Sequence, residues 1–253
     1  MDQSPPSVVD APDARWGVHL QGHAFDLADW ERAFRLPFDP WVERQGNDFY
    51  LRSAALDGLS DPTDVRERAT PLVEQLNGAM FALNNSRPVR FEGVVEFAPN
   101  GTKRVHMMVT VGGIEARASA AAVGVAIVGG ETVPPPPPAP SDAQRWMTIC
   151  EAHPDLADAL VYLSRKDWFD IYKGLECVED WFGSEQQVRD AALIDFDEFR
   201  RVKRTANAFR HRKNGKHLPP SVPATLDEAR ALLTALVAGA FKKAEQSTAT
   251  EEH

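Results

Sequence analysis

The spacing of hydrophobic residues changes along the chain, and the change predicts two kinds of structure. Up to about residue 130, short apolar runs are separated by turn residues. Residues 15–25 predict a strand and residues 27–34 a short helix. Two pairs of β-rich runs predict hairpins that turn at 46–48 and at 99–101, because each turn holds Gly and Asn between the runs. The Gly- and Ala-rich stretch that follows predicts one or two more strands.

One long helix interrupts these strands. Asp61-Pro62 gives an N-cap with proline at the first helical position. Pro71 either bends this helix or restarts it with Thr70 as the cap. Apolar residues then recur at steps of three and four: Val65, Ala69, Leu72, Leu76, Met80 and Leu83. Strands in runs, rather than in strict alternation with helices, predict an α+β fold whose N-terminal part is an antiparallel sheet with two helices.

Residues 134–140 are almost unbroken proline. Such a run forms a polyproline II spacer of roughly 20 Å at about 3.1 Å per residue, so we expect a domain boundary here. The helices after the spacer are expected to fold alone. The predicted divisions are a disordered tail 1–13, an α+β domain 14–131, a proline-rich linker 132–141, an all-α domain 142–245 and a disordered tail 246–253.

Beyond the linker the apolar spacing is helical throughout. Leu156, Leu160 and Leu163 share one helix face, and Trp168 begins the apolar face of the next helix. Three capping boxes predict helix starts further on: Ser184 with Gln187, Asp195 with Glu198, and Thr225 with Glu228. Short connections between helices predict a C-terminal all-α bundle of four or five helices.

Composition excludes several classes of protein. A hydrophobic share of 43% with 26% charged residues is typical of a globular chain and argues against global disorder. A net charge of −9 argues against a generic nucleic-acid coat or a binder of anionic membranes. The N-terminus lacks the basic start and apolar core of a signal peptide, and the apolar run at 121–130 is too short to cross a bilayer. We therefore expect a cytoplasmic protein with no membrane partner.

Motifs of familiar cofactor and catalytic sites are absent from the sequence. There is no GxGxxG, no GxxxxGK[ST] and no GxSxG. Cys150 and Cys177 form no CxxC and are interpreted as buried free thiols. His19 and His23 lack the HExxH glutamate, and on a strand they would lie too far apart to share a metal. We expect neither a metal nor a cofactor.

Charge is segregated within the helical part. Residues 151–199 hold thirteen Asp or Glu and four Lys or Arg, whereas residues 200–217 hold eight Lys or Arg, two His and no acid. The basic segment could lie against the acidic one as an ordinary solvated face. If the chain binds nucleic acid, this segment is expected to do it, in a salt-dependent manner. The expected contacts are Arg200, Arg201, Lys203, Arg212, Lys213 and Lys216.

Two Arg and His pairs in this segment suggest catalysis. Six residues separate Arg204 from His211, and six separate Arg210 from His217. A histidine can take the proton of an attacking 2′-hydroxyl or protonate the leaving oxygen, and an arginine can hold the phosphate, so such a pair can cleave RNA without a metal. Leu218-Pro219-Pro220 places His217 beyond the helix end. The sequence does not decide between the two pairings.

An Arg followed after four to six residues by a His, near a helix end in a small all-α bundle, resembles the HEPN superfamily. Arg210-His211 followed by His217 fits the family pattern better than Arg204-Thr205 followed by His211. The helix at 167–182 is similar to the family's Glu-bearing helix, with Glu176 as the candidate. The resemblance covers about residues 145–243, and the segments TANAFRHR and PATLDEARALLTALV also resemble uncharacterised bacterial proteins.

The resemblance implies a metal-independent endoribonuclease or RNA-binding effector, a homodimer with paired sites, and a role in bacterial defence or toxin–antitoxin biology. The N-terminal domain would then sense or regulate. Many HEPN members are non-catalytic, so the alternative is a non-enzymatic interaction module whose basic helix end binds an acidic partner. In that case Asn207, Arg210 and His211 would form a structural cluster that holds the following loop. Convergence of Arg210 with His217, or of Arg204 with His211, in an open cleft would favour the enzyme. Side chains of these pairs that radiate into solvent or pair with the acids of 151–199 would favour the module.

Overall fold

The structure, a computed structural model, describes residues 15–98, 102–107, 138–211 and 217–251. The predicted N-terminal tail, the Gly- and Ala-rich stretch and most of the proline run lie outside these residues. Contacts divide the chain into two compact units. The sheet unit contains residues 1–68 and 89–144, and the helical unit contains residues 69–88 and 145–253.

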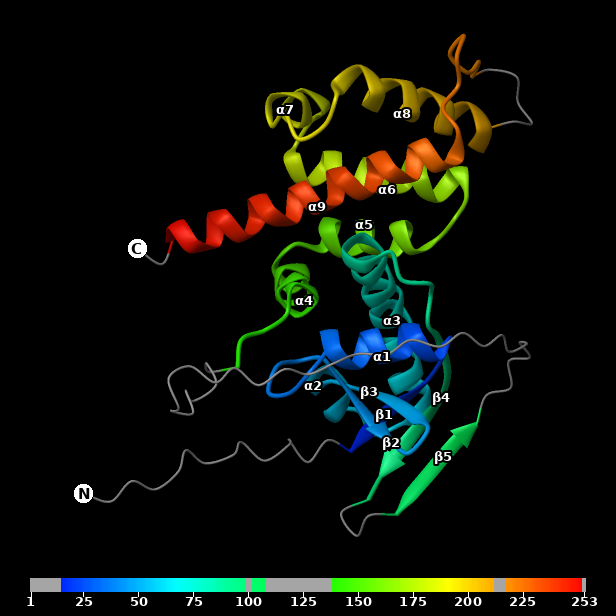
Figure 1. Ribbon diagram of the computed structural model, residues 1–253, viewed down its shortest axis with the longest axis vertical. Helices are drawn as coiled ribbons and strands as arrows, with labels where there is room; N and C mark the ends of the chain where they lie inside the picture. Colours follow the sequence, from blue (N-terminus) through cyan, green and yellow to red (C-terminus); the bar gives the residue numbers. More distant parts are fainter. Residues whose placement is uncertain (1–14, 99–101, 108–137, 212–216, 252–253) are drawn as a thin grey trace, which may run out of the picture. The chain divides into compact units, whose positions relative to one another are not determined.

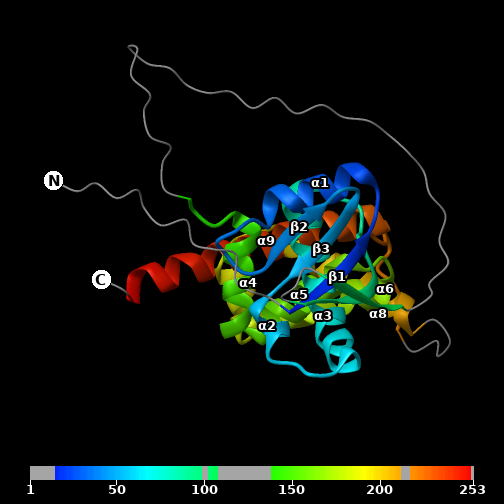
Figure 2. The ribbon, with the colours of Figure 1, turned by 90° about the horizontal axis from the view of Figure 1, so that it is seen from below.

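The sheet unit is built on a five-stranded antiparallel sheet with the order β2-β3-β1-β4-β5 (Figure 1). Figure 2 shows β2, β3 and β1 side by side. The predicted antiparallel α+β arrangement is confirmed. Its described strands are β1 (Trp16–Gln21), β2 (Trp41–Gln45), β3 (Asp48–Arg52), β4 (Arg90–Phe97) and β5 (Lys103–Met107), and its short helices are α1 (Ala24–Ala33) and α2 (Ala54–Asp57).

Alternation along β1 explains which side of the sheet is packed. Trp16, Val18 and Leu20 are almost fully buried, and they share a face because side chains alternate along a strand. His19 points to the opposite face, where its ring nitrogens lie 3.1 Å from Glu92 and 3.6 Å from a carboxylate oxygen of Asp48.

Helix α3 (Pro62–Asn84) begins where the sequence predicts, because the Thr63 amide donates to Asp61 Oδ1 at 2.6 Å. It continues through Pro71 as one helix. From Ala69 onward, α3 belongs to the helical unit. The observed division at Ala69 therefore differs from the domain boundary that the sequence predicts at the proline run. Gly78 gives a physical reason why this part of α3 packs with the later helices. A Cβ at Gly78 would lie 2.1 Å from the carbonyl oxygen of Leu160, so glycine allows two helix backbones to touch.

The rest of the helical unit follows the proline run. Its described helices are α4 (Asp142–Ala152, within this unit from Arg145), α5 (Pro154–Ser164), α6 (Trp168–Phe182), α7 (Glu185–Asp190), α8 (Phe196–Arg210) and α9 (Leu226–Glu251). Helix α6 packs against α5, α8 and α9 (Figure 1). The count of described helices is six rather than four or five, because α4 adds one. Its buried Trp146, which stacks on Phe241 at 4.3 Å, and Cys150 lie four residues apart, as in an amphipathic helix.

All three predicted capping boxes start helices in this unit. Ser184 Oγ accepts from the Gln187 amide at 3.3 Å, and Asp195 Oδ1 accepts from the Glu198 amide at 2.9 Å. The Thr225 box is reciprocal, because the Glu228 carboxylate also accepts from the Thr225 amide at 2.7 Å. Within the described ranges, no helix is both long enough and apolar enough to cross a membrane.

Candidate functional site

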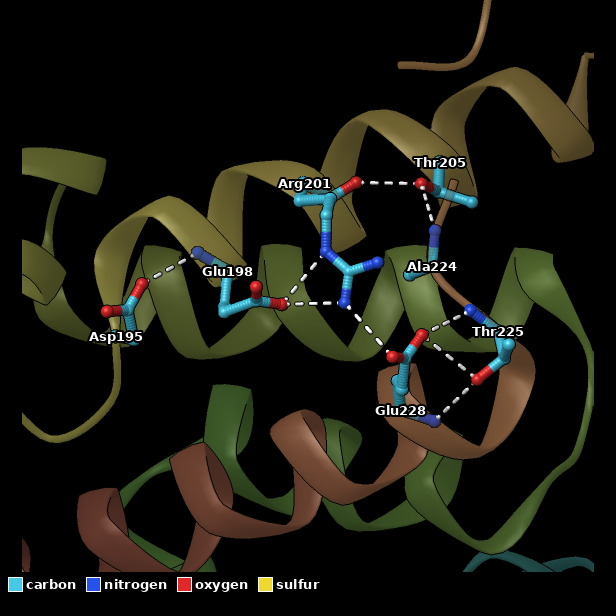
Figure 3. Close-up of polar contacts among 7 residues, drawn as sticks. All are labelled: Asp195, Glu198, Arg201, Thr205, Ala224, Thr225 and Glu228. Atoms are coloured by element: carbon cyan, nitrogen blue, oxygen red, sulfur yellow. Dashed lines mark hydrogen bonds and ion pairs between the residues drawn. The ribbon is translucent and has the colours of Figure 1, made fainter. Parts of the chain in front are cut away.

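Helix α8 carries most of the basic segment and is anchored through Thr205. The side chain of Thr205 is fully buried, donates to the carbonyl of Arg201 at 2.8 Å and accepts from the amide of Ala224 at 3.1 Å (Figure 3). Ala224 belongs to the segment that runs from His217 into α9. The hydroxyl of Thr205 therefore ties this segment to α8 and helps to place His217 near the helix end.

At the C-terminal end of α8, Asn207 joins the best-fitting Arg and His pair. Arg210 Nε donates to Asn207 Oδ1 at 3.0 Å, and Asn207 Nδ2 lies 3.3 Å from His217 Nδ1. The His211 and His217 rings lie 5.0 Å apart between centroids. We call Asn207, Arg210, His211 and His217 the α8-end cluster. Arg204 lies one turn earlier and is outside this bonded chain.

The hydrogen bonds of the α8-end cluster have a defined direction. Because an arginine nitrogen can only donate, Asn207 must present its carbonyl oxygen to Arg210. The amide nitrogen of Asn207 then faces His217 and also donates, so His217 Nδ1 must be the acceptor. In the neutral ring the proton consequently sits on Nε2 of His217.

The guanidinium of Arg210 also packs on an aromatic ring. Its guanidinium carbon lies 3.3 Å from the centroid of the Tyr172 ring on α6. Glu176, one turn further along α6, accepts from Lys173 Nζ at 2.7 Å. Burial would raise the pKa of Glu176, but hydrogen bonds from Lys173 and Tyr172 and the charges of Lys173 and Arg210 lower it. Glu176 therefore supports Arg210 through Tyr172 as an ionised carboxylate.

An open pocket of about 260 Å³ adjoins the α8-end cluster. We call it the α8 pocket, and it shares Asn207 with the cluster. Three of its lining side chains are cations and one is an acid, so it favours an anionic ligand. The residues that line it are Tyr172, Glu185, Arg200, Lys203, Arg204 and Asn207.

Two of the predicted nucleic-acid contacts have partners within the helical unit. Lys203 is held by Glu179 and, at 3.2 Å, by Glu185. Burial would lower the pKa of Lys203, but its bonds to these two carboxylates raise it. Arg201 contacts Glu198 at 2.7 Å and Glu228 at 3.4 Å (Figure 3). The pairs with Glu179, Glu185 and Glu198 match a basic segment that lies against the acidic one as an ordinary solvated face.

The other predicted contacts behave differently. Arg200 and Arg204 are exposed, and within the part of the chain that the structure describes they have no ion-pair partner. Arg212, Lys213 and Lys216 lie outside the described residues. The basic segment is thus divided into neutralised cations and cations that are available to a ligand.

Metal-ligand groups and cysteine thiols were the other candidates for chemistry in the described residues. Among them, no group of three or more His, Cys, Asp or Glu could hold a metal ion. Cys150 and Cys177 are free thiols. Burial, with the charges of nearby acids, raises the pKa of each thiol to about 12, so neither forms a reactive thiolate near neutral pH.

Tyr172 is the site residue that the sequence analysis missed. It precedes Glu176 by four residues on the same helix, so helical spacing placed it beside a residue that was already a candidate.

Comparison of the chain with protein-family models, curated proteins and solved structures gives no match.

Proposed function

We propose that the helical unit binds RNA at the α8-end cluster and cleaves it without a metal. The observation that carries this proposal is the bonded chain from Arg210 through Asn207 to His217, with the His211 ring 5.0 Å from His217. An arginine and two histidines at one point supply what the reaction needs. The guanidinium stabilises the phosphate in the transition state, and an imidazole transfers the proton.

We infer the role of His217 from the direction of its hydrogen bond and give the remaining proton transfers to His211. The lone pair of His217 Nδ1 is occupied by Asn207, so its Nε2–H donates to a phosphate oxygen beside Arg210. His211 then takes the proton of the 2′-hydroxyl as its oxygen attacks phosphorus. The bond to the 5′-oxygen breaks, and His211 returns the proton to that oxygen. The products are a 2′,3′-cyclic phosphate and a free 5′-hydroxyl.

Three further elements of the proposal rest on the resemblance to the HEPN superfamily. These are a homodimer of the helical unit, a role in bacterial defence or toxin–antitoxin biology, and a sensing or regulatory task for the sheet unit. None of them is needed for the chemistry at the α8-end cluster, so each can fail separately.

A second candidate function is a non-enzymatic interaction module, and the ion pairs of Lys203 and Arg201 favour it. In this account Asn207 and His217 only tie the segment after α8 back to the helix. The same histidine variants test both accounts, because only the enzyme has an activity that their removal can abolish.

The test is incubation of labelled RNA with the purified chain in EDTA. We expect cleavage by the wild type and a loss of about 10²–10⁴-fold in His211→Ala, the range for a lost acid–base group. We expect a strong loss in His217→Ala as well, with melting temperatures close to that of the wild type. The control is His153→Ala, which removes a histidine at the start of α5 and should retain activity.

The opposite outcome would support the module. Wild-type protein would leave the RNA intact. Because His217 is exposed, loss of its bond to Asn207 would cost His217→Ala only about 0.5–1.5 kcal/mol of stability, so the absence of RNA cleavage is the deciding result.

A further inference from the structure

We infer that Arg200 and Arg204 form a subsite for the backbone phosphates next to the cleaved one, and that the substrate is single-stranded RNA lying along α8. This inference rests on the proposed function for the identity of the ligand. The subsite itself rests on the arrangement of side chains along one face of α8 and on the α8 pocket.

Four polar residues form a single row on α8. Arg200, Arg204, Asn207 and His211 follow one another at steps of four, three and four residues, and such steps keep side chains on one helix face. At 1.5 Å per residue the row extends over about 16 Å. Three of the four residues come from the helix proper, and His211 is its C-cap. The row therefore leads from the α8 pocket directly into the α8-end cluster.

The first two members of the row are available to a ligand. Arg200 and Arg204 both line the α8 pocket, are exposed and have no ion-pair partner among the described residues. Each guanidinium has five N–H donors in a planar fork that matches the oxygens of a phosphate. About 6 Å of helix separates the two residues. Two neighbouring phosphates of an extended strand could each be held by one arginine.

Ion-paired side chains border the row on both sides, so the row has room for one RNA strand. At about 100° per residue, Lys203 projects to one side of the row and Arg201 to the other. Lys203 is accompanied by Glu179 and Glu185, and Arg201 by Glu198 and Glu228. The second strand of a duplex would bring its phosphates towards these carboxylates. Repulsion between like charges thus favours single-stranded RNA.

The closing experiment measures binding without cleavage. A labelled 2′-O-methyl single strand, which has no attacking hydroxyl, is titrated with the full chain at several salt concentrations. We expect the slope of log K against log salt to fall by about 1.4 in Arg200→Gln/Arg204→Gln, since each single-strand phosphate contact contributes about 0.7. The matched control is Arg68→Gln/Lys242→Gln, which removes two exposed positive charges outside the row and should leave the slope nearly unchanged.

The outcomes separate the subsite from the proposed cleavage. An unchanged slope in the Arg200 and Arg204 variant, or equally tight binding of a 2′-O-methyl duplex, would overturn the inference even if the wild type cleaves RNA. Binding that depends on these two arginines, in a protein that leaves unmodified RNA intact, would support the subsite and reject the cleavage. On a cleavable strand we expect the same variant to raise KM and to retain kcat.

Discussion

At the scale of single residues, the side-chain amide of Asn207 fixes the direction of the hydrogen bonds in the α8-end cluster. An amide has one accepting and one donating end, so Arg210 and His217 can be satisfied at the same time. A carboxylate at this position would accept from both neighbours. It would keep the bond to Arg210 and reverse the bond to His217.

We therefore predict that Asn207→Asp moves the proton of neutral His217 from Nε2 to Nδ1. Nitrogen NMR of histidine-labelled protein distinguishes the two tautomers without any assay of activity. If the Nε2–H of His217 stabilises the phosphate, the variant should also lose cleavage, because the donor becomes an acceptor. The same tautomer in wild type and variant would contradict the bond direction derived from Arg210. Asn207→Leu, which can neither donate nor accept, is the control for shape.

At the scale of elements, the start of α6 contains a pair of carboxylates. Asp167 caps the helix by accepting from the Asp170 amide at 2.9 Å. The Asp170 side chain is buried, and one of its oxygens lies 3.7 Å from Arg165, which also bonds Glu74 of α3 at 3.0 Å. Burial and the neighbouring Asp167 raise the pKa of Asp170 to about 6, because the ionised form is disfavoured there.

This shift predicts a pH dependence of stability. The folded chain holds the Asp170 proton more tightly than the unfolded chain, whose carboxyl titrates near 3.9. The stabilising contribution is therefore full below about pH 4 and is lost as the pH rises through about 6. Asp170→Asn keeps the backbone cap and removes the titration. We expect the stability of the wild type relative to this variant to fall by about 1–3 kcal/mol between pH 4 and pH 7.

Urea unfolding of both proteins at several pH values measures this difference. Parallel pH profiles would show that the Asp170 carboxyl does not carry the effect. The control is Asp190→Asn, which removes an exposed carboxylate in the last turn of α7. Its stability should change with pH as that of the wild type does.

At the scale of the whole molecule, the helical unit includes part of α3. Three contacts join residues 69–88 to the later helices. Gly78 faces the carbonyl of Leu160, Glu74 pairs with Arg165, and the ring of Phe81 lies 4.2 Å from the guanidinium of Arg230. A chain cut at the proline run would lose all three, which argues against the expectation that the later helices fold alone.

We predict that a fragment of residues 141–253 is stabilised by a synthetic peptide of residues 62–88. At a hundredfold excess over its Kd, such a peptide should add about 2.7 kcal/mol. The same peptide with Gly78→Ala should add nothing, because its Cβ would collide with the backbone at Leu160. Circular dichroism during heating is the measurement. A fragment whose cooperative melting is unaffected by either peptide would support the proline run as the boundary.

Local features of this protein followed from the sequence alone. The caps at Asp61, Ser184, Asp195 and Thr225 lie where the sequence predicts them, and the strands of both predicted hairpins form. Each of these features depends on residues within a few positions of one another. Capping, turn chemistry and apolar spacing act over that range, so no tertiary information is needed.

Tertiary structure alone decided which residues of the basic segment can act together. The sequence did not decide between the pairing of Arg204 with His211 and that of Arg210 with His217, although the second fits the HEPN pattern better, and Asn207 joins only the second pair. Neutralisation of Lys203 by Glu179 and Glu185, and the ring of Tyr172 beneath Arg210, depend on how α6, α7 and α8 pack. Packing brings together side chains that are many residues apart in the sequence. The apolar periodicity of one helix shows which face is buried, but it does not show which other helix packs against that face.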